Sequence, residues 1–135
     1  MRPTTLASVR LITDDVERLT AFYERVTGVT ADRPSPDFAE LRTGRGTLAI
    51  GSTRTVQVFG PGSASPAANR TAIVEFLVDD VDVLFTRLRD TVETVTPPTT
   101  MPWGNRSLLV RDPDGTLVNL FTPVSPQARE RNGME

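Results

Sequence analysis

Two pairs of adjacent aspartates are the clearest candidates for acid–base groups in the sequence. Asp14-Asp15 and Asp79-Asp80 each follow a short run of apolar, mostly β-branched residues and precede apolar residues at helical spacing. Paired carboxylates can serve as a general acid and a general base. An aspartate at such a place also caps the amino end of a helix. Capping explains both pairs, so we assign them no catalytic role.

The surroundings of the two acidic pairs are repeated along the chain. The segment 8–19 (SVRLITDDVERL) returns 65 positions later as the segment 73–84 (IVEFLVDDVDVL). A second repeat joins 56–61 (VQVFGP) to 118–123 (VNLFTP), 62 positions apart. Repetition at a fixed spacing indicates two copies of one structural unit. The matched positions that carry or lack chemistry are Ser8 with Ile73, Arg10 with Glu75, and Gln57 with Asn119.

The composition excludes several classes of function. The 135 residues include no cysteine and no histidine, so disulfides, thiolate nucleophiles and imidazole ligands are all excluded. The 15 basic and 17 acidic residues give a net charge of −2, which offers no basic surface to nucleic acid. No apolar run is long enough to cross a membrane, and no signal peptide is evident. We expect a cytoplasmic protein with neither nucleic acid nor membrane as a partner.

The first repeat predicts a module with the order βαβββ over residues 5–60. Apolar residues at helical spacing follow Asp15, and Gly28 is a typical helix stop. The breaker-rich stretch 31–37 predicts a loop. Short alternating or β-branched runs predict the strands; these are 6–12, 38–42, 47–51 and 55–59.

The second repeat predicts the same order over residues 71–123, after a linker at 61–70 that is rich in glycine, proline and serine. The expected elements are a helix at 81–92 and strands at 73–78, 92–96, 107–111 and 116–121. The stretch 97–105 predicts a loop, and Asp112-Pro-Asp-Gly115 predicts a hairpin turn. Residues 1–124 then form one domain, and 125–135 form a polar tail without regular structure.

Four short signatures occur in a fixed order between residues 6 and 123. They are 13–16 (TDDV), 78–82 (VDDVD), 102–104 (PWG) and 112–115 (DPDG), the first being followed by Phe22-Tyr23 and Gly28. Together with the repeat, they resemble the vicinal oxygen chelate superfamily of glyoxalases, bleomycin-resistance proteins and extradiol dioxygenases. The resemblance implies an α+β fold. In it, two tandem βαβββ modules form a half-open mixed β-barrel around a cleft.

The resemblance also implies where a metal ion would be held. Enzymes of that superfamily hold it on the first and last strands of each module, typically with His, Gln or Glu. Alignment of the repeats places those positions at Ser8, Gln57, Ile73 and Asn119. A hydroxyl, two amides and an aliphatic group lack the charge or the imidazole nitrogen that divalent ions prefer. We therefore expect no metal, no other cofactor and no catalytic residue of the usual kind.

Side-chain alternation along the strands predicts which residues line the implied cleft. If Ser8 and Ile73 point inward, so do the residues two positions further along. The loop tryptophan is added because its ring could close the cleft or contact a ligand. The candidate ligand-binding residues are Ser8, Arg10, Gln57, Phe59, Ile73, Glu75, Trp103, Asn119 and Phe121.

Each candidate has an alternative structural role. Arg10 and Glu75 form an ion pair with each other, or one or both of them bind a polar or charged ligand group. Gln57 and Asn119 either bond to neighbouring side chains or recognise a ligand. Trp103 either plugs one end of the barrel or stacks on a flat ring.

The leading hypothesis is a metal-free protein that sequesters a small organic molecule, such as an aromatic metabolite. The resemblance to bleomycin-resistance proteins implies a role in antibiotic resistance and a homodimer that holds ligands between its subunits. The alternative is a lyase, an isomerase or a dioxygenase-type enzyme with an atypical site, in which a buried Glu75 would be the base. A third hypothesis is a partner-binding domain without a ligand.

Overall fold

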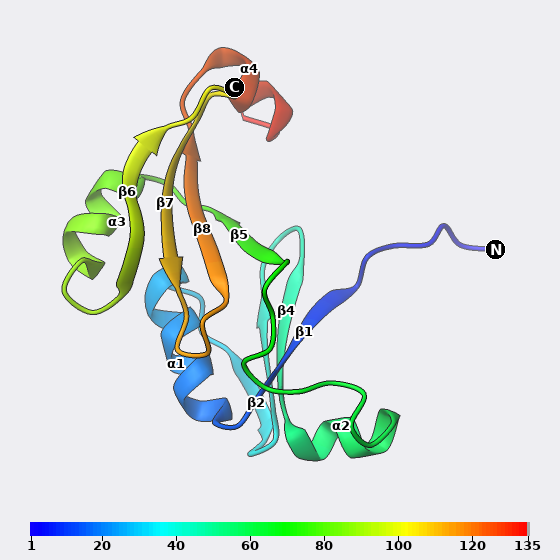
Figure 1. Ribbon diagram of the computed structural model, residues 1–135. Helices are drawn as coiled ribbons and strands as arrows, with labels where there is room; N and C mark the ends of the chain where they lie inside the picture. Colours follow the sequence, from blue (N-terminus) through cyan, green and yellow to red (C-terminus); the bar gives the residue numbers. More distant parts are fainter. Residues whose placement is uncertain (135) are drawn as a thin grey trace. The chain divides into compact units, whose positions relative to one another are not determined.

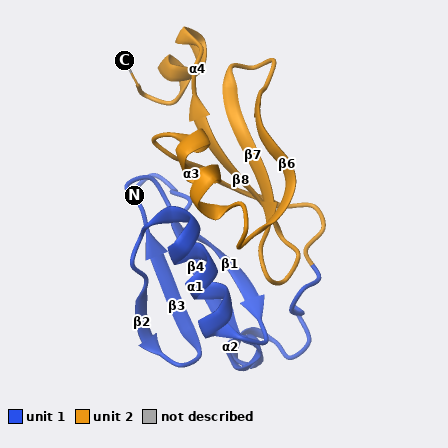
Figure 2. Cartoon of the chain, turned by 90° about the vertical axis from the view of Figure 1, so that its left-hand side faces the viewer, with its two compact units in different colours: residues 1–68 blue, residues 69–135 orange. Residues whose placement is uncertain are grey.

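The computed structural model describes residues 1–134 and divides the chain into two compact units. The boundary between Ala68 and Asn69 lies within the predicted linker (Figure 2). Each unit contains one four-stranded sheet and two helices. The prediction of two tandem α+β modules is therefore confirmed, while the closure of two sheets around a cleft stays a prediction.

The first unit has the order βαβββ followed by a short helix. Its sheet has the order β1-β4-β3-β2, in which β1 runs parallel to β4 and the other neighbours are antiparallel. Strands β1 and β4 lie side by side in Figure 1, and Figure 2 shows all four strands. The elements are β1 (Ser8–Thr13), α1 (Val16–Thr27), β2 (Asp32–Ser35), β3 (Phe38–Arg42), β4 (Thr47–Ser52) and α2 (Thr53–Phe59).

Helix α1 begins and ends where the sequence predicts. The Asp15 carboxylate accepts a hydrogen bond from the Arg18 backbone N–H at 3.0 Å, as an N-cap does. Gly28 ends the helix in the left-handed conformation, with φ 75°. The buried face consists of Leu19, Thr20, Phe22, Tyr23 and Val26. This face packs on β3 and β4, and removal of its apolar side chains from water stabilises the unit.

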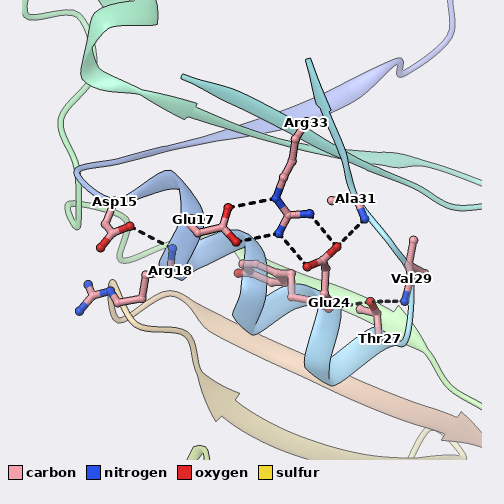
Figure 3. Close-up of polar contacts among 9 residues, drawn as sticks. Asp15, Glu17, Arg18, Glu24, Thr27, Val29, Ala31 and Arg33 are labelled. Atoms are coloured by element: carbon pink, nitrogen blue, oxygen red, sulfur yellow. Dashed lines mark hydrogen bonds and ion pairs between the residues drawn. The ribbon is translucent and has the colours of Figure 1, made fainter. Parts of the chain in front are cut away.

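The prediction of a loop at 31–37 is wrong, because residues 32–35 form strand β2. All four of its residues are exposed, so side-chain bonds rather than apolar burial hold it in place. Arg33 bonds to Glu17 at 3.0 Å and to Glu24 at 2.8 Å, and the Ala31 N–H donates to Glu24 (Figure 3). These bonds lower the pKa of Glu24 to about 2, chiefly through the Arg33 guanidinium.

The prediction of a strand at 55–59 is wrong, because these residues lie in helix α2. Strand β4 ends at Ser52, whose hydroxyl accepts from the Arg54 N–H at 3.2 Å and donates to Asp37 at 2.8 Å. A serine at the N-cap position favours the start of a helix. This local signal overrides the β-like alternation of the residues that follow. The order βαβββ is confirmed, but its last three strands are β2, β3 and β4.

The second unit repeats the order βαβββ and also ends in a short helix. Its sheet has the order β5-β8-β7-β6, with β5 parallel to β8. The elements are β5 (Ile73–Leu77), α3 (Val81–Leu88), β6 (Glu93–Thr100), β7 (Asn105–Arg111), β8 (Leu117–Pro123) and α4 (Pro126–Arg131). Its most deeply buried strand residues are Leu108, Val110, Val118 and Leu120.

Three predictions for this unit are wrong. Helix α3 ends at Leu88, four residues before the predicted end at 92. Strand β6 continues to Thr100, across the first four residues of the expected loop, and pairs with β7 through register shifts. The expected tail contains α4, because Ser125 caps it by accepting from the Ala128 N–H at 3.0 Å and Ala128 is buried. The turn after β7 is confirmed, since the Asp112 N–H donates to Thr116 and Gly115 has φ 86°.

None of the helices in residues 1–134 is both long and apolar enough to cross a membrane.

Candidate functional site

Arg10 contacts two aromatic rings of the first unit. Its guanidinium carbon lies 4.8 Å from the centre of the Phe38 ring and 5.0 Å from the centre of the Phe59 ring. A cation over an aromatic face at this range is attracted by the ring's electron density. Arg10 comes from β1, Phe38 from β3 and Phe59 from α2. Three elements therefore fix one guanidinium.

Gly51 in β4 makes this arrangement possible. It pairs with Ile12 of β1 on one side and with Phe38 of β3 on the other. A Cβ atom at Gly51 would lie 3.5 Å from the Arg10 Cδ and 2.7 Å from the Thr55 Oγ1. The missing side chain thus lets Thr55 of α2 approach the sheet, and it leaves the Arg10 stem in ordinary van der Waals range of the Gly51 backbone position.

The sequence reasoning missed Phe38 and Gly51, although it placed both on the correct strands. The signal for Gly51 was a glycine inside a strand, which often marks a close approach by another group. We call Arg10, Phe38, Gly51 and Phe59 the Arg10 cluster.

Gln57 does not belong to this cluster. It lies on α2, two residues from Phe59, and residues at that spacing on a helix do not face each other. The match between Gln57 and Asn119 is therefore wrong as a structural equivalence. In the sheets, Arg10 pairs with Ala49 and Glu75 pairs with Asn119. Because Arg10 and Glu75 are matched by the repeat, Ala49 is the counterpart of Asn119.

Glu75 and Asn119 form the corresponding polar pair of the second unit. The Asn119 Nδ2 donates to the Glu75 Oε2 at 2.8 Å. Two neighbouring register pairs, Ile73 with Leu117 and Leu77 with Phe121, place Ile73 and Phe121 on the same face of the sheet. Three strand residues predicted to share a face with Glu75 are thus brought together. Glu75 is exposed, so the burial that would make it a base is absent.

Three buried oxygens on this face have no hydrogen-bond partner among residues 1–134. They are the Asn119 Oδ1, the Ser107 Oγ and the Asn105 Oδ1, since Asn105 pairs with Pro123 on the same face. Ser107 pairs with Phe121 across β7 and β8, two residues along the strand from the pair that includes Asn119. The polar groups of this face therefore keep unused hydrogen-bonding capacity.

Trp103 lies apart from these residues within the second unit. It is 57% exposed in the turn before β7, and its carbonyl accepts from Arg131 at 2.9 Å. Asn119 pairs with Leu109, four residues along β7 from its first residue. At the usual rise per strand residue, about 13 Å separates that start from the level of Asn119. The exposure of Trp103 does not match the predicted role as a core plug. Stacking of Trp103 on a ligand ring stays a prediction.

Comparison with known families decides the classification. The sequence profile of the Glyoxalase/Bleomycin resistance protein/Dioxygenase superfamily matches residues 5–120. The chain belongs to this superfamily. No curated protein sequence is significantly similar to it.

Solved structures have a similar fold, and those from Nocardioides and Burkholderia phytofirmans PsJN carry the superfamily's name. A glyoxalase/bleomycin resistance protein/dioxygenase from Nocardioides is 24% identical, with 93% of this chain and 87% of that chain covered and a TM-score of 0.72. A family enzyme from Burkholderia phytofirmans PsJN is 20% identical, with coverage of 87% and 98% and a TM-score of 0.76. TioX from Micromonospora sp. ML1 is 29% identical, with coverage of 90% and 100% and a TM-score of 0.67.

The residues at the superfamily's metal positions do not fit a divalent ion. With the corrected equivalence, these positions hold Ser8, Ala49, Ile73 and Asn119. Two of the four side chains are aliphatic, and the amide of Asn119 is already bonded to Glu75. Residues 1–134 contain no group of three Asp, Glu, His or Cys side chains that could hold a metal ion. A single carboxylate, Glu75, is a weak donor set for such an ion.

Proposed function

We propose that this protein binds and sequesters a small organic molecule, such as an aromatic metabolite or antibiotic, without using a metal ion. The observation that carries the proposal is the chemistry at the superfamily's metal positions. An enzyme of the superfamily needs charged or imidazole donors there, and this chain has an alcohol, two aliphatic groups and one amide.

Two polar groups support ligand binding in place of metal binding. Arg10 and Glu75 occupy matched positions of the two modules, and each is fixed by neighbours within its own unit. Small-molecule sites are typically apolar surfaces with a few fixed polar groups of this kind.

Further parts of the proposal come from the family resemblance. Bleomycin-resistance proteins act as homodimers that hold their ligands between subunits, and we propose the same assembly for this chain. We also propose that it acts in the cytoplasm and protects the cell by lowering the free concentration of its ligand.

A ligand screen tests this function. The protein is screened by thermal shift against aromatic metabolites and antibiotics, and each ligand that stabilises it is incubated with it and recovered for mass spectrometry. We expect at least one stabilising ligand that is recovered chemically unchanged. Recovery of a converted product would instead identify an enzyme, and a screen without any stabilising ligand would contradict binding.

A further inference from the structure

We infer that the Arg10 cluster binds the carboxylate of an aromatic acid, with the Arg10 guanidinium on the carboxylate and the Phe59 ring against the aromatic part. The inference rests on the proposed function and narrows its ligand class. It follows from three features of the first unit.

The first feature is that the guanidinium is held in place before any ligand binds. It contacts the Phe38 ring at 4.8 Å and the Phe59 ring at 5.0 Å, and the Arg10 stem lies against Gly51. These contacts restrict a side chain that otherwise has many rotamers. A planar guanidinium stacked on aromatic rings keeps its N–H edges available for bonding in the ring plane. Less conformational entropy is then lost when a ligand binds.

The second feature is that these N–H donors have no acceptor within their unit. Arg33, Arg42 and Arg54 of the same unit each form an ion pair with a carboxylate. Among the described residues of this unit, no carboxylate forms an ion pair with Arg10. The register places Glu40 on the same face of the sheet as Arg10, two strands away. Its carboxylate bonds to Arg42 at 2.7 Å.

A fork of N–H donors in one plane matches the two oxygens of a carboxylate. Such a site favours an anion over a cation of the same size, because the guanidinium stays charged at all physiological pH values.

The third feature is an exposed aromatic surface beside the guanidinium. Phe59 is 73% exposed although it contacts Arg10. A ring of this kind can stack on a flat apolar ligand group. An anion site next to an open aromatic ring fits a molecule that joins an aryl ring to a carboxylate by a short spacer.

Three indoles of similar size test the charge preference by isothermal titration calorimetry. Indole-3-propionate carries a carboxylate, tryptamine an ammonium group and 3-methylindole no charge. We expect indole-3-propionate to bind at least tenfold more tightly than tryptamine, with 3-methylindole between them. Equal or tighter binding of tryptamine would overturn the inference.

Matched variants test the residues. Arg10→Gln is expected to weaken indole-3-propionate binding at least tenfold and to leave 3-methylindole binding within twofold. Arg10→Lys keeps the charge without the planar fork and should give an intermediate loss. Arg25→Gln removes an exposed arginine of the same unit and serves as the control for net charge. An unchanged affinity for the acid in Arg10→Gln would overturn the inference.

Two further variants test the geometry. Phe59→Ala should weaken the acid and 3-methylindole alike, because it removes the aromatic surface. Gly51→Val should weaken binding of the acid, because its Cβ would collide with the Thr55 hydroxyl of α2, the helix that carries Phe59, and its methyl groups would crowd the Arg10 stem. Circular dichroism confirms that the variant is folded. Full affinity for the acid in Gly51→Val would contradict the geometry.

The outcomes separate this inference from the proposed function. If the library screen finds ligands whose binding does not depend on Arg10, the proposed function stands and the inference is wrong. If none of the three indoles binds, the inference is wrong whatever else the screen finds. Conversion of a bound indole to a product would contradict the proposed function alone.

Discussion

At the scale of single residues, Ser107 is an unusual member of the second sheet. It is 4% exposed, and its hydroxyl has no hydrogen-bond partner among the described residues. A buried hydroxyl without a partner costs about 1–3 kcal/mol of the free energy of unfolding. Ser52 of the first unit is also a buried serine, but its hydroxyl is paired: it caps α2 and donates to Asp37.

We predict that Ser107→Ala leaves the free energy of unfolding unchanged or raises it by up to about 1 kcal/mol, because it removes an unpaired polar group. Ser52→Ala is the control and should lower that free energy by about 1 kcal/mol. Urea unfolding at neutral pH measures both. A loss of more than about 1 kcal/mol in Ser107→Ala would mean that the hydroxyl has a partner in solution.

The Arg33 bonds give a pH-dependent contribution to stability. The pKa of Glu24 is about 2 in the folded chain, against 4.5 for an unperturbed glutamate. A lowered pKa in the folded state stabilises the fold above the unfolded value of 4.5, and this stabilisation is lost as the pH falls toward 2.

Arg33→Gln is therefore expected to lower the free energy of unfolding by about 1 kcal/mol at neutral pH, since both ion pairs are partly exposed. The difference from the wild type should shrink as the pH falls from about 5 to about 2. Urea unfolding across this range measures it. A difference that stays constant with pH would show that Glu24 does not titrate in this way.

At the scale of elements, Gly104 fixes the approach of α4 to the second sheet. It has φ +94°, and a Cβ atom there would collide with Ser125, the N-cap of α4, and lie 3.1 Å from the Ala128 Cβ. The N–H groups of Val124 and Ser125 both donate to its carbonyl. The helix is therefore anchored at a position that only glycine suits.

We predict that Gly104→Ala lowers the free energy of unfolding by about 2 kcal/mol or more, through the positive φ and the collision together. Gly44→Ala is the control, because a Cβ atom at Gly44 meets nothing within 4 Å, and it should stay within about 0.5 kcal/mol of the wild type. Thermal and urea unfolding measure both. Equal stability of the two variants would contradict the anchoring of α4.

Most elements were predictable from local signals, and the exceptions have local causes. Capping aspartates fix the starts of α1 and α3, Gly28 fixes the end of α1, and the turn at Asp112 joins the last two strands. The residues 53–59 alternate like a strand, yet the cap at Ser52 makes them a helix. Strand β2 depends on ion pairs from Arg33 to Glu24 and Glu17, which precede it by 9 and 16 positions in the sequence. No local pattern shows such pairs.

The candidate site was predictable on the first strand of each module and on the last strand of the second. Arg10 and Glu75 follow from the repeat, and each is the third residue of its strand. Asn119 and Phe121 were placed correctly on the face of Glu75. Gln57 was misplaced because the second repeat matches sequence and not structure. The contact of Phe59 with Arg10 depends on α2, and the role of Gly51 depends on three strands meeting there. Neither can be read from a strand pattern.

At the scale of the whole molecule, the chain keeps the duplicated scaffold of the glyoxalase, bleomycin resistance and dioxygenase superfamily and lacks its usual metal donors. The two modules carry opposite charges at one matched position, Arg10 in the first and Glu75 in the second. Each charge is fixed within its own unit by different means, stacking in one case and an amide hydrogen bond in the other. A fold can retain its modules while its site chemistry changes.

Binding of the small molecule by this protein should not require a metal ion. Calorimetric titration of the best ligand from the screen into the protein tests this, first in excess EDTA and then with Zn, Mn, Ni or Fe(II) added. We predict the same dissociation constant in all conditions, within twofold, and a ligand stoichiometry that does not change. Loss of binding in EDTA, restored by one equivalent of one of these ions, would show that a metal ion is required.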